Sequence, residues 1–478
     1  MAEISIKLLI NKEQKQVVFA EAESDFMTFM FSFFTLPLGS IVQLLGKQSG
    51  LGSLDSLYKS VEQLDVKHLQ TEACKEMLLN PRSDAARICV DGCFTQSTCY
   101  CSYVTKARCS RCGKLMDKAL SWPKSTVENK GIFVNDGASF IITDDLRMMP
   151  ISYINVLSVL EELRINDTSI LEERVINVGN KEALSLLRRS LESKHALTEV
   201  FFPDSCVEPS GKCFSMIKEE IEDTKAGQKF NLKIILNKKN NSVLSAEVGG
   251  DFLNQLLSFL TFPLGSVIRL LCNRISSECC INNLYFSAEC LGLECFKSKE
   301  CKNMLVFPQL ASHYGCKSLQ YTPCKHGFRE AKVIEQNPKL RNRKKTNDAG
   351  RSFVEDSKRF MITDNLHISP LSFISFIITK GKDFFFCDVV EKEIIVDKAK
   401  VLSLLGVMLI SKTVLTDVFA PKRKQQSISY YMLLGIFWGF FASFVLLFCY
   451  WGLLVGSLLS LAWFLIVVLS CSLFFSSS

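Results

Sequence analysis

The sequence repeats itself, and this duplication restricts the chain to folds that can be built twice. Residues 4–45 align without a gap with residues 230–271, and 17 of the 42 aligned pairs are identical. The best match is Ser-Phe-Phe-Thr-Leu-Pro-Leu-Gly-Ser at 32–40, which returns as Ser-Phe-Leu-Thr-Phe-Pro-Leu-Gly-Ser at 258–266. The chain is therefore predicted to contain two tandem homologous repeats, and its 478 residues exceed what one ordinary core holds.

Each repeat is predicted to open with a β-hairpin that is followed by helices. Apolar segments flank a polar turn at residues 11–15, and the second repeat has the same pattern. Apolar residues then recur at helical spacing up to Pro37 and Pro263, which cannot lie in a helix interior. We expect each proline to begin a second helix, capped by Thr35 or Thr261. The proline motif suits a binding loop or a buried helix–helix corner, and we predict the corner.

Shorter matches extend the duplication to nearly 200 residues per repeat. Phe140-Ile-Ile-Thr-Asp144 matches Phe360-Met-Ile-Thr-Asp364, and Leu-Thr-Glu-Val-Phe at 197–201 matches Leu-Thr-Asp-Val-Phe at 415–419. The charged stretch 219–229 lacks an apolar period, as is typical of a linker. Mixed strands and helices favour the α+β class. The predicted domains are repeat 1 at 1–205, a linker at 206–229 and repeat 2 at 230–421.

Four cysteines in repeat 1 have the spacing of a zinc ribbon. They are Cys89, Cys93, Cys109 and Cys112, and Gly113-Lys114 follows the second pair. Two cysteine pairs about 15–20 residues apart are typical of a zinc site, in which four thiolates hold the ion tetrahedrally. Cys99 or Cys101 is an alternative to Cys93, and a loop of free cysteines is the alternative to the whole site. We predict a zinc-ribbon element at 89–112.

Repeat 2 offers an internal control for this metal site. It keeps Cys316, which aligns with Cys89, and has Cys324 nearby, but no Cys-x-x-Cys follows. A four-cysteine site therefore cannot be assembled from the matching positions. We expect one zinc ion, in repeat 1 only, and a structural role for it, because four protein sulfurs leave no open position for catalysis.

Other candidate sites have simpler explanations. The carboxylates Asp144 and Asp145 suggest acid–base chemistry, but the second repeat reads Asp364-Asn365, so a turn or helix cap is the better interpretation. The five histidines form no recognisable ligand pair, and no nucleophile elbow, phosphate loop or dinucleotide fingerprint is present. The basic run at 339–345 has no interleaved aromatic residues, which disfavours binding to nucleic acid.

The C-terminal segment is almost entirely apolar. Residues 425–478 contain no charged side chain, and 430–475 is long enough for two membrane passes of about 20 residues each. The basic flank at 422–429 begins with Lys422, Arg423 and Lys424, which favour the cytosolic side. We predict a transmembrane segment at 430–475 and both repeats facing the cytosol, where cysteines stay reduced. The alternative is a translated intron, in which case the protein is cytoplasmic.

Several motifs in this order resemble a known family. They are the opening strand pair, the Thr-x-Pro-Leu-Gly-Ser corner, Cys-x-x-Cys-Gly-Lys, Ile-Thr-Asp-Asp-Leu and the Leu-Thr-Glu-Val-Phe ending. Together they resemble the plant proteins called domain of unknown function 674, over about residues 2–421, and the resemblance stops before the apolar tail. It implies a plant source, and it brings no assigned activity, substrate or catalytic residue.

The sequence thus predicts a non-enzymatic scaffold or interaction protein, with one structural zinc ion and a membrane anchor. Its protein partner is left open. Two alternatives remain. One is an enzyme of unknown class with a cleft between the repeats. The other is a soluble protein that associates with nucleic acid, if the tail is spurious and the basic run is functional.

Overall fold

The computed structural model describes most of both repeats. The described residues are 4–82, 101–102, 118–119, 133–203, 214–216, 228–271, 275–277, 279–310, 314, 339, 352–372, 389–420, 460–461 and 463–466. The chain forms two compact units, Met1–Ala420 and Pro421–Ser478. The first unit holds both repeats and every element named below.

Repeat 1 builds a five-stranded antiparallel sheet, in the order β6-β5-β2-β1-β7. The strands are β1 (Ile4–Asn11), β2 (Gln16–Glu23), β5 (Ser139–Thr143), β6 (Met148–Pro150) and β7 (Leu171–Val178). The opening hairpin of β1 and β2 lies in the middle of the sheet. Alternate residues of its strands, such as Ile6 and Leu8, are buried, because one face of the sheet packs on the core.

Repeat 2 builds a second sheet with the same strand order, β13-β12-β10-β9-β14. Its strands are β9 (Phe230–Asn237), β10 (Ser242–Gly249), β12 (Arg359–Thr363), β13 (Ile368–Pro370) and β14 (Val389–Val396). Both sheets place the last strand of the repeat beside the first, along eight residues. The internal repeat and the α+β class are therefore confirmed.

Among the described residues, the helices follow the strands in the same order in both repeats, and the positions that align with α5 in repeat 2 lie outside the described ones. Those of repeat 1 are α1 (Ser24–Ser32), α2 (Leu38–Leu44), α3 (Leu54–Gln63), α4 (Glu72–Leu79), α5 (Tyr153–Glu162), α6 (Asn180–Glu192) and α7 (Ala196–Phe201). Those of repeat 2 are α8 (Gly250–Ser258), α9 (Leu264–Leu271), α10 (Cys280–Cys290), α11 (Lys299–Val306), α13 (Lys398–Met408) and α14 (Val414–Phe419). The described residues also include the 3-10 turns η1 (Phe33–Thr35), η2 (Val66–His68), η4 (Thr168–Ile170), η5 (Phe259–Thr261) and η6 (Leu293–Cys295). Four short strands form two further pairs, β3 (Cys101–Ser102) with β4 (Lys118–Ala119), and β8 (Phe214–Met216) with β11 (Ile275–Ser277).

The predicted caps of the second helices are wrong. Pro37, not Thr35, occupies the N-cap position of α2, and no side chain caps that helix end. Thr35 lies in η1, where its hydroxyl donates a hydrogen bond to the carbonyl oxygen of Ser32, at 2.8 Å. Thr261 makes the same bond to Ser258 at 2.7 Å. The threonines therefore close the end of the preceding helix, because their hydroxyls reach back three residues.

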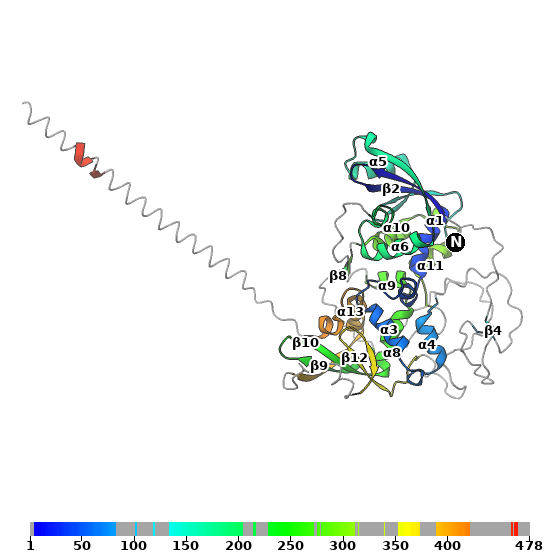
Figure 1. The fold of residues 1–478 in the computed structure, drawn as a ribbon, viewed down its shortest axis with the longest axis vertical. Coiled ribbons are helices and arrows are strands. Elements are labelled where there is room, and N and C mark those ends of the chain that lie inside the picture. Colours follow the sequence, from blue (N-terminus) through cyan, green and yellow to red (C-terminus); the bar gives the residue numbers. More distant parts are fainter. Residues whose placement is uncertain are drawn as a thin grey trace, which may run out of the picture. The chain divides into compact units, whose positions relative to one another are not determined.

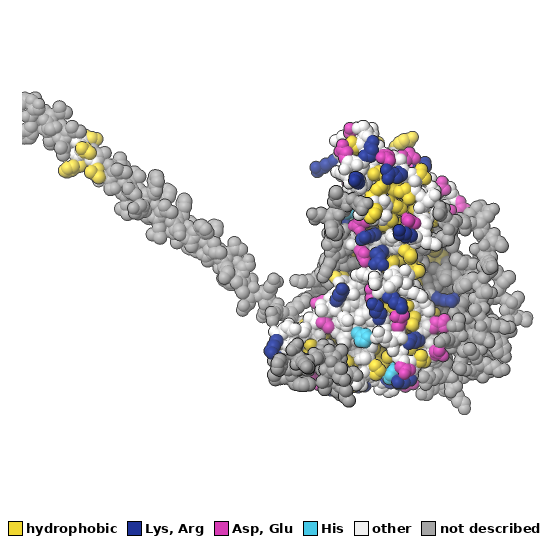
Figure 2. All heavy atoms as spheres, in the orientation of Figure 1, with side chains coloured by type: hydrophobic (Ala, Val, Ile, Leu, Met, Phe, Trp, Pro, Cys, Tyr) yellow, Lys and Arg dark blue, Asp and Glu magenta, His cyan; other side chains and the backbone are white. Residues whose placement is uncertain are grey.

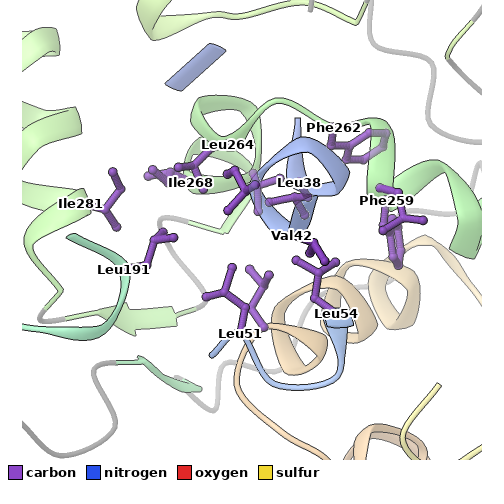
Figure 3. Packing of buried hydrophobic residues seen from close by; sticks show 14 of the residues in the cluster. Leu38, Val42, Leu51, Leu54, Leu191, Phe259, Phe262, Leu264, Ile268 and Ile281 are labelled. Atoms are coloured by element: carbon purple, nitrogen blue, oxygen red, sulfur yellow. The ribbon is translucent and has the colours of Figure 1, made fainter. Parts of the chain in front are cut away.

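Most of the helices lie between the two sheets, and each repeat covers part of the other's sheet. Figure 1 labels α6, α10, α9 and α3 between β2 at one end and the strands β9, β10 and β12 at the other. Helix α10 of repeat 2 packs against β6 and α6 of repeat 1, and α3 of repeat 1 packs against β13 of repeat 2. Figure 3 shows the resulting shared core, in which Leu38 and Val42 lie among Phe259 and Phe262.

The contact between the repeats follows a pseudo-twofold axis. Pro37 pairs with Pro263 in an isolated antiparallel bridge. The amide of Leu38 donates to the carbonyl oxygen of Phe262, and the amide of Leu264 donates to that of Leu36, both at 2.9 Å. Because equivalent residues exchange equivalent bonds, the two repeats are arranged like the subunits of a symmetric dimer.

Small residues of the proline motif allow this close approach. A Cβ atom on Gly39 would lie 3.1 Å from the carbonyl oxygen of Leu260, and one on Gly265 would lie 3.0 Å from the Cβ of Phe34. The hydroxyl of Ser40, the next residue, donates to the carbonyl oxygen of Pro81 at 2.9 Å. The motif therefore forms a buried corner, as predicted, and the corner is the place where the repeats meet.

Helix α5 lies outside the main core. Phe140 and Ile142 of β5 belong to the shared core, so Ile141 between them points to the opposite face of the sheet. Ile141 is nevertheless buried, as is Val159 of α5. Since α5 contacts β5, this helix covers part of the outer face of the first sheet.

The predicted transmembrane segment at 430–475 is wrong for the part of the chain that the structure describes. A bilayer requires about 20 consecutive apolar helical residues. Among the described residues, no helix is both long enough and apolar enough to cross a membrane. Within 430–475 the structure describes two helical pieces, 460–461 and 463–466, and the other residues of the segment lie outside the described ones. The predicted localisation is not tested by these residues.

Candidate functional site

The most site-like group of polar side chains surrounds the buried carboxylate of Asp144, in the turn after β5. This carboxylate accepts hydrogen bonds from the backbone amide and the hydroxyl of Thr198, both at 2.8 Å. It also lies 3.1 Å from Nδ1 of His195 and accepts a bond from Nε2 of Gln16 at 3.2 Å. Three segments that are far apart in the sequence thus meet at one acidic group.

The fold requires Asp144 at this position. The turn between β5 and β6 has a left-handed residue, Leu146, at φ 62°. This turn directs Asp144 at the first turn of α7, where it satisfies the amide of Thr198, and its carbonyl oxygen accepts from the amide of Ala196 at 3.0 Å. The hydroxyl of Thr198 in turn accepts from the amide of Val17 on β2, at 2.9 Å. Asp144 therefore joins the sheet to α7. The predicted turn before Leu146 is confirmed, whereas no helix begins there, and the helix that the carboxylate contacts is α7.

His195 adds a titratable group to this structural network. Its hydrogen bond to Asp144 raises the pKa of the imidazole, and partial burial opposes the shift. About one third of the side chain is exposed. An aspartate that holds Nδ1 of a histidine is the arrangement used in general-base catalysis. Among the described residues, no hydroxyl or thiol forms a hydrogen bond with Nε2 of His195.

The equivalent position in repeat 2 shows which contacts of Asp144 belong to the fold. It keeps the aspartate–threonine pair and lacks the histidine and the glutamine. Asp364 accepts from the amide and the hydroxyl of Thr416, at 2.8 and 2.7 Å, and Thr416 accepts from the amide of Val243. Thr413 replaces His195 and Ser242 replaces Gln16. Burial raises the pKa of Asp364, while its bonds to Thr416 oppose the shift. The aspartate–threonine pair serves the fold in both repeats, and His195 supplies a titratable partner for the aspartate only in repeat 1.

Asp144 and Asp145 do not form a carboxylate pair. Asp145 points away to Nε of Arg147, at 3.0 Å, and Arg147 also binds Glu162 of α5. The side-chain amide of Asn283 on α10 donates to the carbonyl oxygen of Asp145 at 2.9 Å. The second aspartate thus links the turn to α5 and to repeat 2.

A family model described as "Protein of unknown function (DUF674)" matches residues 1–279, 226–322 and 320–435. The chain belongs to the DUF674 family. The three matched segments overlap and together span both repeats, as expected for tandem copies of this domain. No curated protein and no solved structure matches the chain. Family membership therefore supports the duplication and assigns no activity.

The predicted zinc ligands of this DUF674 chain, Cys89, Cys93, Cys109 and Cys112, lie outside the described residues. Within the described ranges, no group of three or more His, Cys, Asp or Glu side chains is placed to hold a metal ion. The basic run is described only at Lys339. That side chain is buried, and its ammonium lies 3.6 Å from the centre of the Phe353 ring. At this position the run is therefore packed inside and does not face solvent.

His195 is the residue of this group that sequence reasoning missed. It stands 51 positions from Asp144, and no fixed spacing connects them. The available signal was the alignment of the repeats, which shows that Asp144 has a counterpart and His195 has none. This difference indicates an addition to one repeat and not a requirement of the DUF674 fold.

Proposed function

We propose that this DUF674 protein is a non-enzymatic interaction protein that binds a protein partner through the exposed apolar face of α5. The observation that carries the proposal is the exposure of three large apolar residues in its first two turns. Tyr153 is 91% exposed, Ile154 79% and Leu157 64%. Positions i, i+1 and i+4 of a helix lie on one side, so the three side chains form a continuous patch.

The patch is held on a fixed base. Val159, on the opposite side of α5, is only 3% exposed and anchors the helix to the sheet. The hydroxyl of Ser152 caps the helix by accepting from the amide of Asn155, and the side chain of Asn155 donates to the carbonyl oxygen of Pro150. A rigid helix that exposes a contiguous apolar surface is typical of a protein-binding site.

The surface around α5 fits this proposal. Figure 2 shows hydrophobic side chains at the surface near the end of the first unit where Figure 1 labels α5 and β2. Two more exposed apolar residues flank α5 in the sequence, Ile151 before it and Leu163 after it. With them, the apolar surface at α5 is larger than the scattered single residues that are normal on a surface.

The alternative of an enzyme with a cleft between the repeats is less well supported. The region where the repeats meet is occupied by buried apolar side chains such as Leu38, Phe262 and Leu264 (Figure 3). The Asp144 group has a structural explanation that holds in both repeats. An interaction role therefore accounts for more of the described surface than a catalytic one.

A matched pair of substitutions tests the proposal in the full-length chain. Leu157→Glu places a charge in the patch, and Leu184→Glu places the same charge at a partly exposed leucine of α6. Affinity capture from the native source, followed by mass spectrometry, is expected to recover the same partner with the wild type and Leu184→Glu and to lose it with Leu157→Glu. Equal recovery with both variants overturns the proposal. Circular dichroism confirms that both variants are folded.

A further inference from the structure

The contact surface between the repeats is reciprocal in its hydrogen bonds. The amide of Gln70 donates to the carbonyl oxygen of Phe353 at 2.8 Å, and the amide of Lys297 donates to that of Phe133 at 3.0 Å. Gln70 aligns with Lys297, and Phe133 with Phe353. The bonds of Leu38 and Leu264 across the axis form a second reciprocal pair. These backbone bonds are therefore made in both directions.

A serine in each repeat extends this pattern to side chains. The hydroxyl of Ser60 accepts from the amide of Ile368 at 3.0 Å, and the hydroxyl of Ser287 accepts from the amide of Met148 at 2.9 Å. Ser60 and Ser287 are equivalent, as are Met148 and Ile368. Repeat 1 thus carries both the hydroxyl and the amide that this contact requires.

Two copies of repeat 1 could also make the aromatic contact that crosses the axis. Phe34 of repeat 1 packs edge-to-face on Tyr285 of repeat 2, with ring centres 5.4 Å apart. The repeat 1 counterpart of Tyr285 is Tyr58. The hydroxyl of Tyr285 is fixed on the carbonyl oxygen of Val306 at 2.7 Å, and that of Tyr58 on Leu79 at 3.0 Å. Tyr58 is therefore held in the orientation that the contact needs.

We propose that the surface of repeat 1 around Pro37 is a homotypic docking surface whose partner is a second copy of repeat 1 from another chain. The hydrogen bonds of Leu38 and Leu264 at the axis join backbone atoms, so they do not depend on side-chain identity. Gly39 leaves room for the backbone of the partner repeat, as Gly265 does in repeat 2. In the intact chain the covalent connection presents repeat 2 at an effective concentration on the order of millimolar. The second copy of repeat 1 therefore gains access once that connection is cut.

One contact favours the pairing of repeat 1 with repeat 2. The side-chain amide of Asn283 donates to the carbonyl oxygen of Asp145 at 2.9 Å and to its carboxylate at 3.2 Å. Ser56 stands at the equivalent position of repeat 1 and is too short to make both bonds. Asn283 thus biases the docking surface towards repeat 2 without being required for the shared contacts.

The experiment uses the full-length chain with a protease site inserted between residues 217 and 227. The chain is cleaved, unfolded in denaturant and refolded by dilution at micromolar concentration, and native mass spectrometry identifies the pairs by mass. We expect pairs of two N-terminal halves beside the mixed pairs. Asn283→Ser is expected to raise their share roughly three- to tenfold, as for the loss of one hydrogen bond.

Asn282→Ser is the matched control, because the neighbouring Asn282 has no recorded bond to repeat 1 among the described residues. This variant is expected to leave the share unchanged. Refolding that gives only mixed pairs, or separate folded halves, overturns the proposal. An equal response to Asn282→Ser and Asn283→Ser overturns the assigned role of Asn283.

Discussion

Pro37 and Pro263 face each other in an antiparallel bridge, and they occupy equivalent positions of the two repeats. A residue meets its own counterpart only at an axis of twofold symmetry, so this contact locates the pseudo-twofold axis within the proline motif. The duplicated motif is therefore duplicated for a structural reason, because both copies are needed to form one contact.

The glycine of the motif is expected to be sensitive to a single added methyl group. Gly39→Ala would place a Cβ atom 3.0 to 3.1 Å from Pro81 and from two carbonyl oxygens. We expect the free energy of unfolding to fall by about 1–3 kcal/mol, as is typical of overpacking. Urea unfolding followed by far-ultraviolet circular dichroism measures this change. Gln43→Ala on the exposed side of the same helix is the control, and an equal effect of both substitutions would contradict the assigned close approach.

His195 is expected to give the protein a pH-dependent increment of stability. The bond to Asp144 raises the pKa of His195 in the folded state, so the folded protein binds this proton more tightly than the unfolded chain. This contribution to stability is fully present at pH values below about 6.5, the pKa of histidine in an unfolded chain. It is lost as the pH rises through the raised pKa of His195 in the folded state. The difference in unfolding free energy between the wild type and His195→Thr should therefore be largest near pH 5 and shrink above neutrality.

His68 provides the control of opposite sign for that measurement. Burial lowers the pKa of His68, so its protonation opposes folding. Relative to His68→Gln, the wild type should lose stability as the pH falls below about 6.5. Parallel curves for the two histidine variants would contradict the role assigned to Asp144.

The substitution Thr413→His would introduce into repeat 2 the counterpart of His195. Burial raises the pKa of Asp364, so the folded state favours its protonated form, and this contribution to stability is lost as the pH rises through that pKa. Thr413→His would place a cationic partner beside the ionised carboxylate. We expect the variant to be more stable than the wild type near pH 6 and to lose this advantage as the new histidine deprotonates. Thermal unfolding at several pH values measures the difference between the variant and the wild type. A difference that does not change with pH would contradict ion pairing between the new histidine and Asp364.

The two faces of α5 are expected to respond differently to a charge. Leu157→Glu should change the free energy of unfolding by less than about 0.5 kcal/mol, because the side chain is exposed. Val159→Glu should destabilise the protein by several times that amount, because it buries an unpaired carboxylate. Chemical denaturation distinguishes the two. A large loss of stability in Leu157→Glu would show that the patch is part of the core.

The zinc site remains a prediction that metal analysis can test. The purified protein is expected to contain about one zinc ion per chain, bound by Cys89, Cys93, Cys109 and Cys112. Cys112→Ser should remove the ion and lower the stability of repeat 1. Cys290→Ser, at an exposed free cysteine, should leave the zinc content unchanged. Zinc-free wild-type protein, analysed by inductively coupled plasma mass spectrometry, would rule the site out.

Local features of the fold could be predicted from the sequence, because they depend on neighbouring residues. The hairpin of β1 and β2 follows from two apolar segments around a polar turn, and the buried face of α8 follows from the spacing of Phe252, Leu253 and Leu256. The corner at Pro37 was predicted correctly, whereas the cap at Thr35 was not. A threonine one or two residues before a helix can bond forwards or backwards, and the sequence does not distinguish these choices.

The sharing of helices between the repeats could not be predicted in this way. The apolar face of α10 has the same pattern whether it covers its own sheet or that of repeat 1, and homologous repeats offer similar surfaces. The pairing of His195 with Asp144 was equally hidden, because it depends on the placement of α7 beside the turn after β5. The exposed residues of α5 have an apolar period that also occurs in core helices, so only the structure shows that they face solvent.

The packing of α10 on β6 and α6 has a consequence for biosynthesis. The ribosome completes the last helix of repeat 1 at Phe201, but α10 ends only at Cys290. At translation rates of about 5–20 residues per second, α10 is completed roughly 4–18 seconds after α7. Until then, β6 and α6 lack the helix that packs on them in the finished protein. During this interval the nascent chain exposes apolar surface that the finished protein buries, and a chaperone or a second nascent chain on the same messenger RNA can occupy it.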